Sequence, residues 1–245
     1  MALVLDPLPG LPEVRPGDDL AALLAGAPLD PPLGPGDVLV VAHKVVSKAE
    51  GRVRELAGVE PGERARALAA EHGKDPRHVQ VVLDETAELL RADHGRLICR
   101  TRHGFTCANA GVDQSNAGAP QTVILLPEDP DGSARALRAR LGAGAVVITD
   151  SWGRAWRHGQ IEVAIGCAGL APLTDWRGAD DRDGRTIASS VTALADEVAA
   201  AADLVRGKAS GQPAVRVRGL AHAITEDDGP GAAALVRPPE EDLFR

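Results

Sequence analysis

The sequence predicts a fold of the mixed α+β class, and three features of its 245 residues lead to that prediction. Buried strands are expected at 37–42 and 145–148, and helices at 61–72 and 188–205, so both kinds of element are present. They do not alternate as regular β-α-β units, which argues against a doubly wound sheet. Aromatic residues make up 2% of the chain and tyrosine is absent, so the core must consist of Val, Leu, Ile and Ala.

The first half of the chain opens with a Pro/Gly-rich stretch, residues 1–36, and continues with strands and helices. Within this stretch, residues 8–14 are expected to be extended, and 18–24 to form a short helix that starts near Asp18 or Asp19. The elements expected next are a buried strand at 37–42 followed directly by the polar segment 44–51, a helix at 61–72 opened by Pro and Glu, a strand at 79–83, and a hairpin of 96–102 and 104–108 that turns at His103-Gly104.

The second half is expected to hold the longest helix. Residues 117–135 are predicted to be a loop with one strand at 122–126, in which Asp129-Pro-Asp-Gly132 forms a turn and Ser133 caps a basic helix to Leu141. The elements expected after it are a strand at 145–148, a polar loop from 149, a strand at 161–169, a polar turn at 180–185, a helix at 188–205 ended by Gly207, a strand at 213–219 and a loop-like tail. There is no internal repeat.

Composition excludes several classes of function. The net charge of −8 argues against nucleic acid as the main partner. No apolar run approaches the ~20 residues of a membrane span, and no charged region precedes an apolar core as in a signal peptide. The three cysteines, Cys99, Cys107 and Cys167, are odd in number and contain no C-x-x-C. They indicate buried, reduced thiols in a cytoplasmic protein.

The segment 148–159 concentrates polar chemistry at the end of a buried strand. Asp150, Ser151, Gly153, Arg154 and Arg157 fall within eight residues. Open sheets place their sites at the carboxyl ends of strands, and a carboxylate beside a hydroxyl is a common ligand pair for magnesium or manganese. The alternative is that Asp150 and Ser151 only cap a turn.

A second polar segment, 107–116, carries another acid, Asp113, among the small residues Asn109, Gly111 and Asn116. Small residues let the backbone approach a ligand closely. Two separated acids with cations nearby favour a divalent metal that holds a phosphorylated ligand. The alternative for Asp113 is a surface turn.

Cations and glycines offer further contacts for phosphate. Lys44 and Lys48 follow a strand end, either as phosphate ligands or as solvated charges. The segment 207–213 is either a helix C-cap with its connection or a phosphate nest containing Lys208. Glu162 is interpreted as structural, facing out of its strand, and His43 is the one histidine in a candidate site segment. No P-loop and no covalent nucleophile motif is present.

Several blocks of sequence, in order and over nearly the whole chain, resemble the coenzyme F420-0:L-glutamate ligases, also called F420 γ-glutamyl ligases. These blocks are Leu-Pro-Glu-Val at 11–14, His-Lys-Val-Val-Ser-Lys-Ala-Glu-Gly-Arg at 43–52, His-Gly-Phe-Thr-Cys-Ala-Asn-Ala-Gly-Val-Asp-Gln-Ser-Asn at 103–116, Thr-Asp-Ser-Trp-Gly-Arg-Ala-Trp-Arg at 149–157, Val-Ala-Ile-Gly-Cys-Ala-Gly at 163–169, 195–205 and Val-Arg-Gly-Leu at 217–220.

The resemblance implies a GTP-dependent ligase that adds L-glutamate to coenzyme F420-0 through an acyl phosphate, then adds γ-linked glutamates. It implies Mn²⁺ or Mg²⁺, and often K⁺. The matched metal positions are Asp113, Asp150 and Ser151. The positions expected to bind GTP are Leu11, Pro12, Glu13, Val14, His43, Lys48, Asn116, Gly207 and Lys208. Arg154 and Arg157 are expected to offset charge during phosphoryl transfer.

The chain departs from the family pattern at three positions. His43 stands where serine is frequent, Lys208 where archaeal members carry glutamine near the metals, and Arg100 where glutamate is expected. The resemblance also implies one ligase domain over 1–245 with two intertwined subdomains, a homodimer, and a nitroreductase-like domain fused in actinobacteria where this chain ends. The alternatives are a related ligase with another acceptor and a non-catalytic F420- or nucleotide-binding domain.

Overall fold

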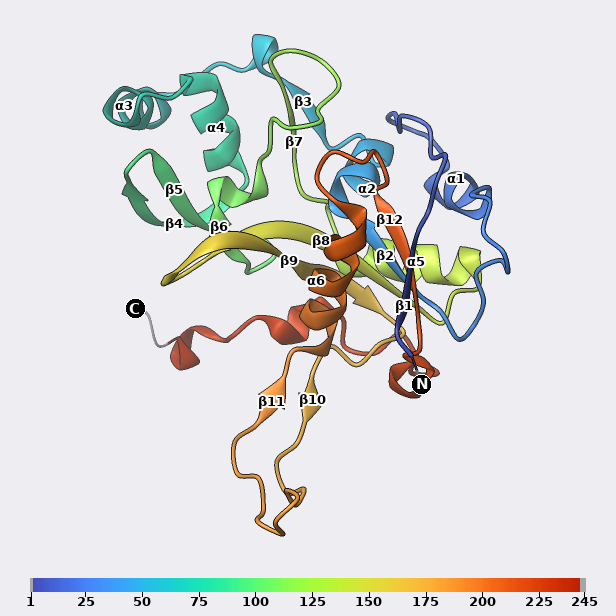
Figure 1. Cartoon of the computed structure of the whole chain (residues 1–245). Coiled ribbons are helices and arrows are strands. Elements are labelled where there is room, and N and C mark those ends of the chain that lie inside the picture. Colours follow the sequence, from blue (N-terminus) through green and yellow to red (C-terminus); the bar gives the residue numbers. More distant parts are fainter. Residues whose placement is uncertain (1, 243–245) are drawn as a thin grey trace.

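The computed structural model describes residues 2–242, and its centre is a five-stranded mixed sheet (Figure 1). The strand order is β1 (Val4–Pro7), β12 (Ala214–Arg218), β2 (Val38–Ala42), β8 (Ala145–Arg154), β9 (Arg157–Ala168). β2 and β8 are parallel, whereas the other neighbours are antiparallel. The mixed α+β class predicted from the sequence is confirmed.

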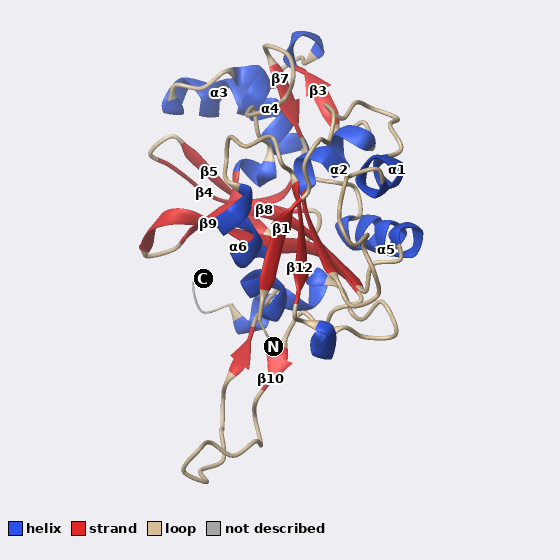
Figure 2. Ribbon diagram, turned by 45° about the vertical axis from the view of Figure 1, so that its right-hand side comes forward, coloured by secondary structure: helices blue, strands red, loops and turns tan. Residues whose placement is uncertain are grey.

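Helices cover both faces of this sheet, as Figure 2 shows. One face packs on α6 (Leu194–Arg206), and the other on α5 (Pro130–Leu141), with α1 (Leu20–Ala25) and α2 (His43–Ala49) beside it. Successive side chains of a strand point to opposite faces. Val147 accordingly packs in the α6 core and Ile148 in the α5 core, so β8 is an unbroken apolar strand.

A second group of elements, residues 53–124, has its own core. It contains α3 (Glu63–His72), α4 (Pro76–Asp84), a sheet of β4 (Thr86–Asp93), β5 (Arg96–Thr101) and β6 (Thr106–Ala108), and the pair β3 (Val53–Glu55) and β7 (Thr122–Ile124). Leu56, Val79 and Leu97 are among its fully buried residues. In the chain it is inserted between α2 and α5, and its strand β6 contacts β8.

The prediction of a strand at 79–83 was wrong, because these residues belong to α4. The Asp75 side chain accepts a hydrogen bond from the Arg77 backbone N–H, and Pro76 occupies the first helical turn. A cap followed by proline is a strong helix start, and it outweighs the β preference of three valines. Strands β1 and β4 were not anticipated.

Three boundaries also differ from the predictions. Residues 149–154 continue β8 and pair with β9, so the polar segment is a hairpin and not a loop. Helix α5 begins at Pro130 and is capped by Asp129, while Ser133 donates to Glu50. Helix α6 begins at 194, because 188–193 belong to the base of another hairpin.

That hairpin is an arm that extends away from the body (Figures 1 and 2). Its strands are β10 (Thr174–Asp175) and β11 (Val191–Thr192), and the predicted polar turn at 180–185 lies at its far end. Leu173, Trp176 and Val191 are exposed at its base. After β12, the described residues up to 242 form three short 3-10 turns, at 221–223, 232–235 and 239–241.

The three cysteines, Cys99, Cys107 and Cys167, are buried and unpaired, as expected. Separately, none of the helices between residues 2 and 242 has both the length and the apolar character required to cross a bilayer.

Candidate active site

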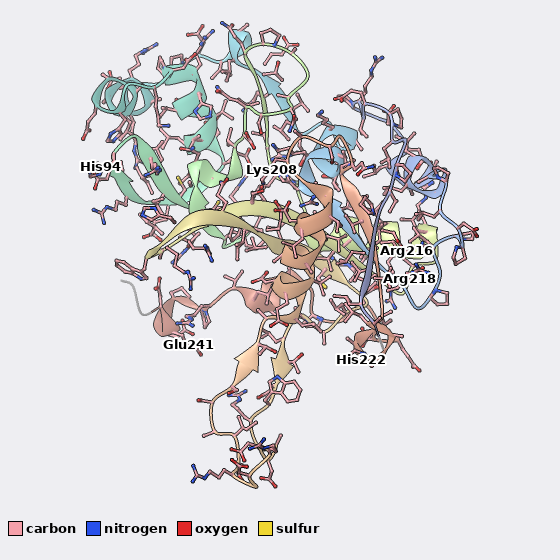
Figure 3. The ribbon with its side chains drawn as sticks, in the orientation of Figure 1. His94, Lys208, Arg216, Arg218, His222 and Glu241 are labelled. Carbon is pink, nitrogen blue, oxygen red and sulfur yellow. The ribbon has the colours of Figure 1, made fainter. Side chains whose placement is uncertain are left out.

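A polar pocket of about 460 Å³ opens beyond the carboxyl end of β2. It is bordered by the start of α2, the end of α6 with the segment 207–213, and the extended segment 11–14. In Figure 3, Lys208 lies near the centre of the molecule above β8 and β9. Strand ends beside a parallel pair are where α/β sheets place ligands.

The pocket brings together most residues that the sequence singled out. Those that line it are Leu11, Pro12, Glu13, Val14, His43, Lys48, Asn116, Asp150, Ser151, Gly207 and Lys208. Asp113 is joined to this group through Lys44, whose Nζ lies 2.7 Å from Asp113 Oδ2. Arg154 and Arg157 are not in the pocket lining.

Asp150 is held by three groups on the α2 side of the sheet. Its Oδ2 accepts a hydrogen bond from Trp152 Nε1 at 2.9 Å, and its Oδ1 accepts one from the Ser151 backbone N–H at 2.8 Å. His43 Nε2 lies 3.3 Å from Oδ1. Burial alone would raise the pKa of this carboxyl, but the His43 ring and the hydrogen bonds outweigh it and lower that pKa.

Ser151 points to the opposite face of β8, toward α6. Its Oγ donates to Glu162 Oε1, and Lys208 Nζ contacts both Ser151 Oγ and, at 3.4 Å, the same carboxylate oxygen. Arg206 Nη2 lies 2.5 Å from Glu162 Oε2. Burial would raise the pKa of Glu162, but the charge of Arg206 and the hydrogen bond from Ser151 lower it.

Two lysines of α2 are paired with acids from other segments. Lys44 contacts Asp113 and the Ser115 hydroxyl, and Lys48 contacts Glu13. Burial would raise the pKa of Asp113, but its hydrogen bond with Lys44 keeps that pKa below the usual value. Helix α2 therefore tethers the segments 11–14 and 113–116 to one side of the pocket.

The arginines predicted to be catalytic lie at the far end of the β8–β9 hairpin. Arg154 pairs with Arg157 across the two strands, and its Nη2 donates to the His158 carbonyl. Trp156, between them, is 87% exposed. Four residues of strand separate Asp150 from Arg154, which corresponds to roughly 13 Å. The structure does not bring these arginines to the pocket of their own chain, and their catalytic role stays a prediction.

Two buried charged residues of the pocket, Glu162 and Arg206, were not selected from the sequence. Glu162 was interpreted as facing out of its strand, but it is 3% exposed and faces the pocket, so that interpretation was wrong. Arg206 is 5% exposed, and both its terminal nitrogens lie 3.2 Å from Thr149 Oγ1. The sequence did hold a signal for Glu162, because this residue lies opposite Ser151 once β8 and β9 are paired.

Arg100, the position where the family resemblance leads us to expect glutamate, pairs with Glu88 at 3.4 Å.

The donor chemistry of the pocket fits a hard divalent cation. Asp113, Asp150 and Glu162 have lowered pKa values, so they are anionic at neutral pH. Carboxylate oxygens are the ligands that Mg²⁺ and Mn²⁺ prefer. Between residues 2 and 242, however, no three His, Cys, Asp or Glu side chains are gathered closely enough to enclose an ion. Any ion held here would take further oxygens from water or a bound phosphate.

The fold and pocket together define a class: an α+β protein whose pocket is lined by paired carboxylates and cations. Comparison with family models identifies it further. Residues 10–219 match the family described as F420-0:Gamma-glutamyl ligase. The chain belongs to this family, as the sequence motifs predicted.

Similar curated proteins cover the chain almost end to end. A protein from Methanopyrus kandleri is 48% identical over 99% of this chain and 98% of its own length. One from Methanothermobacter thermautotrophicus is 43% identical over the full length of both chains, and one from Natronomonas pharaonis is 45% identical over all of this chain and 94% of its own. Each is named coenzyme F420:L-glutamate ligase.

Proposed function

We propose that this protein ligates L-glutamate to coenzyme F420-0 in coenzyme F420 biosynthesis, with GTP as the energy source and GDP as a product. The names of its full-length relatives support the glutamate ligation. The observation that supports a phosphorylated substrate is the lining of the pocket, where Lys44, Lys48 and Lys208 converge from two separate segments. An acidic protein holds a triphosphate through such local cations or through metal.

The binding of GTP would rearrange the ion pairs around the pocket. Lys44 and Lys48 now contact Asp113 and Glu13, and both lysines can turn to phosphate oxygens. Asp150, with Asp113 released from Lys44, would hold the divalent cation, Mn²⁺ or Mg²⁺. When bound, this cation neutralises and orients the phosphates. Residues 11–14 and Asn116 would contact the nucleotide, since they border the same cavity.

The reaction must activate a carboxylate, because joining it to an amine in water is unfavourable. In the proposed mechanism the γ-phosphate passes to the terminal carboxylate of F420-0 and gives an acyl phosphate. The amine of L-glutamate then attacks the carbonyl carbon and displaces inorganic phosphate. Later rounds use the γ-carboxylate of the added glutamate. The lysines of the pocket would offset the charge that develops on the transferred phosphoryl group.

A mass-spectrometric assay tests this function. Purified protein is incubated with F420-0, L-glutamate, GTP and Mn²⁺, and products heavier by one glutamate residue are expected. GTP consumption without glutamate adducts would contradict the proposal. Calorimetry separates the alternatives: metal-dependent GTP binding without F420-0 binding favours another acceptor, and F420-0 binding without GTP binding favours a non-catalytic module.

We also infer a homodimer, as expected for the family. The chain exposes 12862 Å², about a quarter more than the roughly 10,300 Å² of a compact monomer of 25.4 kDa. The arm at 174–192, with Trp176 and Val191 exposed, contributes to this excess. Light scattering is expected to give twice the chain mass, and a Trp176→Ser, Val191→Ser variant is expected to shift toward the monomer. A monomeric wild type would contradict this inference.

A further inference from the structure

The carboxylates around the pocket differ in whether a permanent cation accompanies them. Glu13 is paired with Lys48, Asp113 with Lys44, and Glu162 with Arg206 and Lys208. Asp203 lies 3.6 Å from Arg206. Among the described residues that line the pocket, Asp150 is the carboxylate with no lysine or arginine bound to it, because its neighbours are His43, Trp152 and a backbone N–H.

Glu162 and Ser151, by contrast, already have a full set of partners. Arg206 takes one oxygen of Glu162, and the Ser151 hydroxyl and Lys208 take the other. A divalent ion bound to Ser151 would meet the fixed positive charges of both Arg206 and Lys208. Such like-charge contacts are unfavourable, most of all beside buried groups.

The backbone brings Lys208 to this position directly from the end of α6. Gly207 follows the helix with φ of +63°, in the left-handed region that favours glycine, and turns the chain back over the sheet. The Lys208 side chain is 64% exposed, while its Nζ contacts Ser151 and Glu162. The lysine is therefore a cation that the chain itself supplies to the Ser151–Glu162 pair.

We propose that Lys208 is a built-in monovalent cation for the Ser151–Glu162 pair, so that Ser151 is not a metal ligand and the site takes a single divalent ion, at Asp150. This inference rests on the proposed function only in that the pocket binds metal and triphosphate. It revises the expectation that Asp150 and Ser151 act as one ligand pair, since the two side chains point to opposite faces of β8.

The number of bound Mn²⁺ ions tests the proposal without any turnover. The electron paramagnetic resonance signal of free Mn²⁺ is followed while the ion alone is titrated into the full chain. One Mn²⁺ per chain is expected for the wild type, none for Asp150→Asn, and one for Ser151→Ala. Two ions in the wild type, no ion at all, or loss of the ion in Ser151→Ala would overturn the proposal.

Variants of Lys208 test whether its ammonium group takes the place of a second metal ion, at the Ser151–Glu162 pair. Lys208→Gln removes the charge and supplies an amide oxygen, so a second, weaker Mn²⁺ is expected, which disappears again in Lys208→Gln, Ser151→Ala. Lys208→Arg keeps the charge and is expected to bind one ion. Arg91→Gln is the control, since it removes a cation paired with an acid, Asp93, outside the pocket, and one ion is expected. A single ion in Lys208→Gln would overturn the proposal.

These counts remain informative if the proposed function fails. Titration with a non-hydrolysable GTP analogue and the ligation assay are run on the same preparations. A chain that binds one Mn²⁺ at Asp150 but neither the GTP analogue nor F420-0 would refute the ligase and leave the metal count standing. A chain that ligates glutamate with two Mn²⁺ bound would do the reverse.

Discussion

The base and the tip of the β8–β9 hairpin come from one short polar stretch of sequence but have opposite environments. At the base, Asp150 and Glu162 are largely shielded from solvent, and each contacts a residue of a helix, His43 of α2 and Arg206 of α6. At the tip, Arg157 and His158 are exposed, and Trp156 projects into solvent. Figure 1 shows how far the two strands run beyond the central sheet. Asp150 and Arg154 belong to one motif in the sequence, but four positions along β8 place them in different environments.

This difference shows why sequence proximity is a poor guide to a shared site within a strand. A strand advances about 3.3 Å per residue and alternates its side chains. The four residues from Asp150 to Arg154 along β8 are therefore enough to leave the pocket, and one residue is enough to change face. The base contacts α2 and α6, whereas the tip is supported mainly by its own two strands.

The largest expected effect is on folding stability at the base. Arg206→Met leaves Glu162 buried without its main partner, so the free energy of unfolding is expected to fall by about 3–5 kcal/mol. Urea unfolding measures it. Arg157→Met at the tip is expected to change stability by less than about 0.5 kcal/mol. Similar losses in both variants would show that base and tip do not differ in their energetic contribution.

The next effect is on catalysis at the base. Asp150→Asn keeps the shape of the side chain and a hydrogen-bond acceptor for Trp152 but removes the charge that would hold the metal. Metal-dependent turnover is expected to fall roughly 10²- to 10³-fold with the fold intact. Asp113→Asn is expected to act in the same direction. Asp93→Asn, an exposed aspartate paired with Arg91, is the control. Near-normal rates in Asp150→Asn would remove this residue from the metal site.

A third experiment compares one cation from each region. Lys48→Gln is expected to raise the KM for GTP by roughly 10- to 100-fold, since a charge-assisted hydrogen bond is worth about 1.5–3 kcal/mol. From its position at the tip, Arg157→Gln is expected to change this KM by less than about twofold. An equal loss of activity in both variants would support the sequence-based role of the arginines and would place the tip in the site of a neighbouring copy.

The smallest effect concerns acid. The folded-state pKa of Glu162 is lowered from 4.5, so its ionisation stabilises the fold above that value, and this contribution is lost as pH falls below about 4.5 and through the folded pKa. The free energy of unfolding is measured by urea at pH 7 and in steps below pH 4.5. As the pH is lowered, it is expected to fall less steeply in Glu162→Gln than in the wild type. Arg157→Gln at the tip should leave the slope unchanged, since arginine does not titrate in this pH range. Parallel slopes in wild type and Glu162→Gln would contradict a lowered pKa.

The sequence by itself determined the family, the fold class and the main buried strands. Strands at 37–42 and 145–148 could be predicted because an unbroken run of Val, Leu and Ile has no polar face. The hairpin through His103-Gly104 could also be predicted, because it depends on residues close together in the chain. Half of the residues that line the pocket, 11 of 22, were among the site residues expected from the sequence motifs and the family resemblance.

Only the tertiary structure decided which polar residues face one another. Glu162 becomes a pocket residue through its register opposite Ser151, and Arg206 through the packing of α6 on Thr149, 57 residues away in sequence. Side-chain direction depends on element type, register and long-range packing, and these are settled only when distant segments bury their apolar faces together.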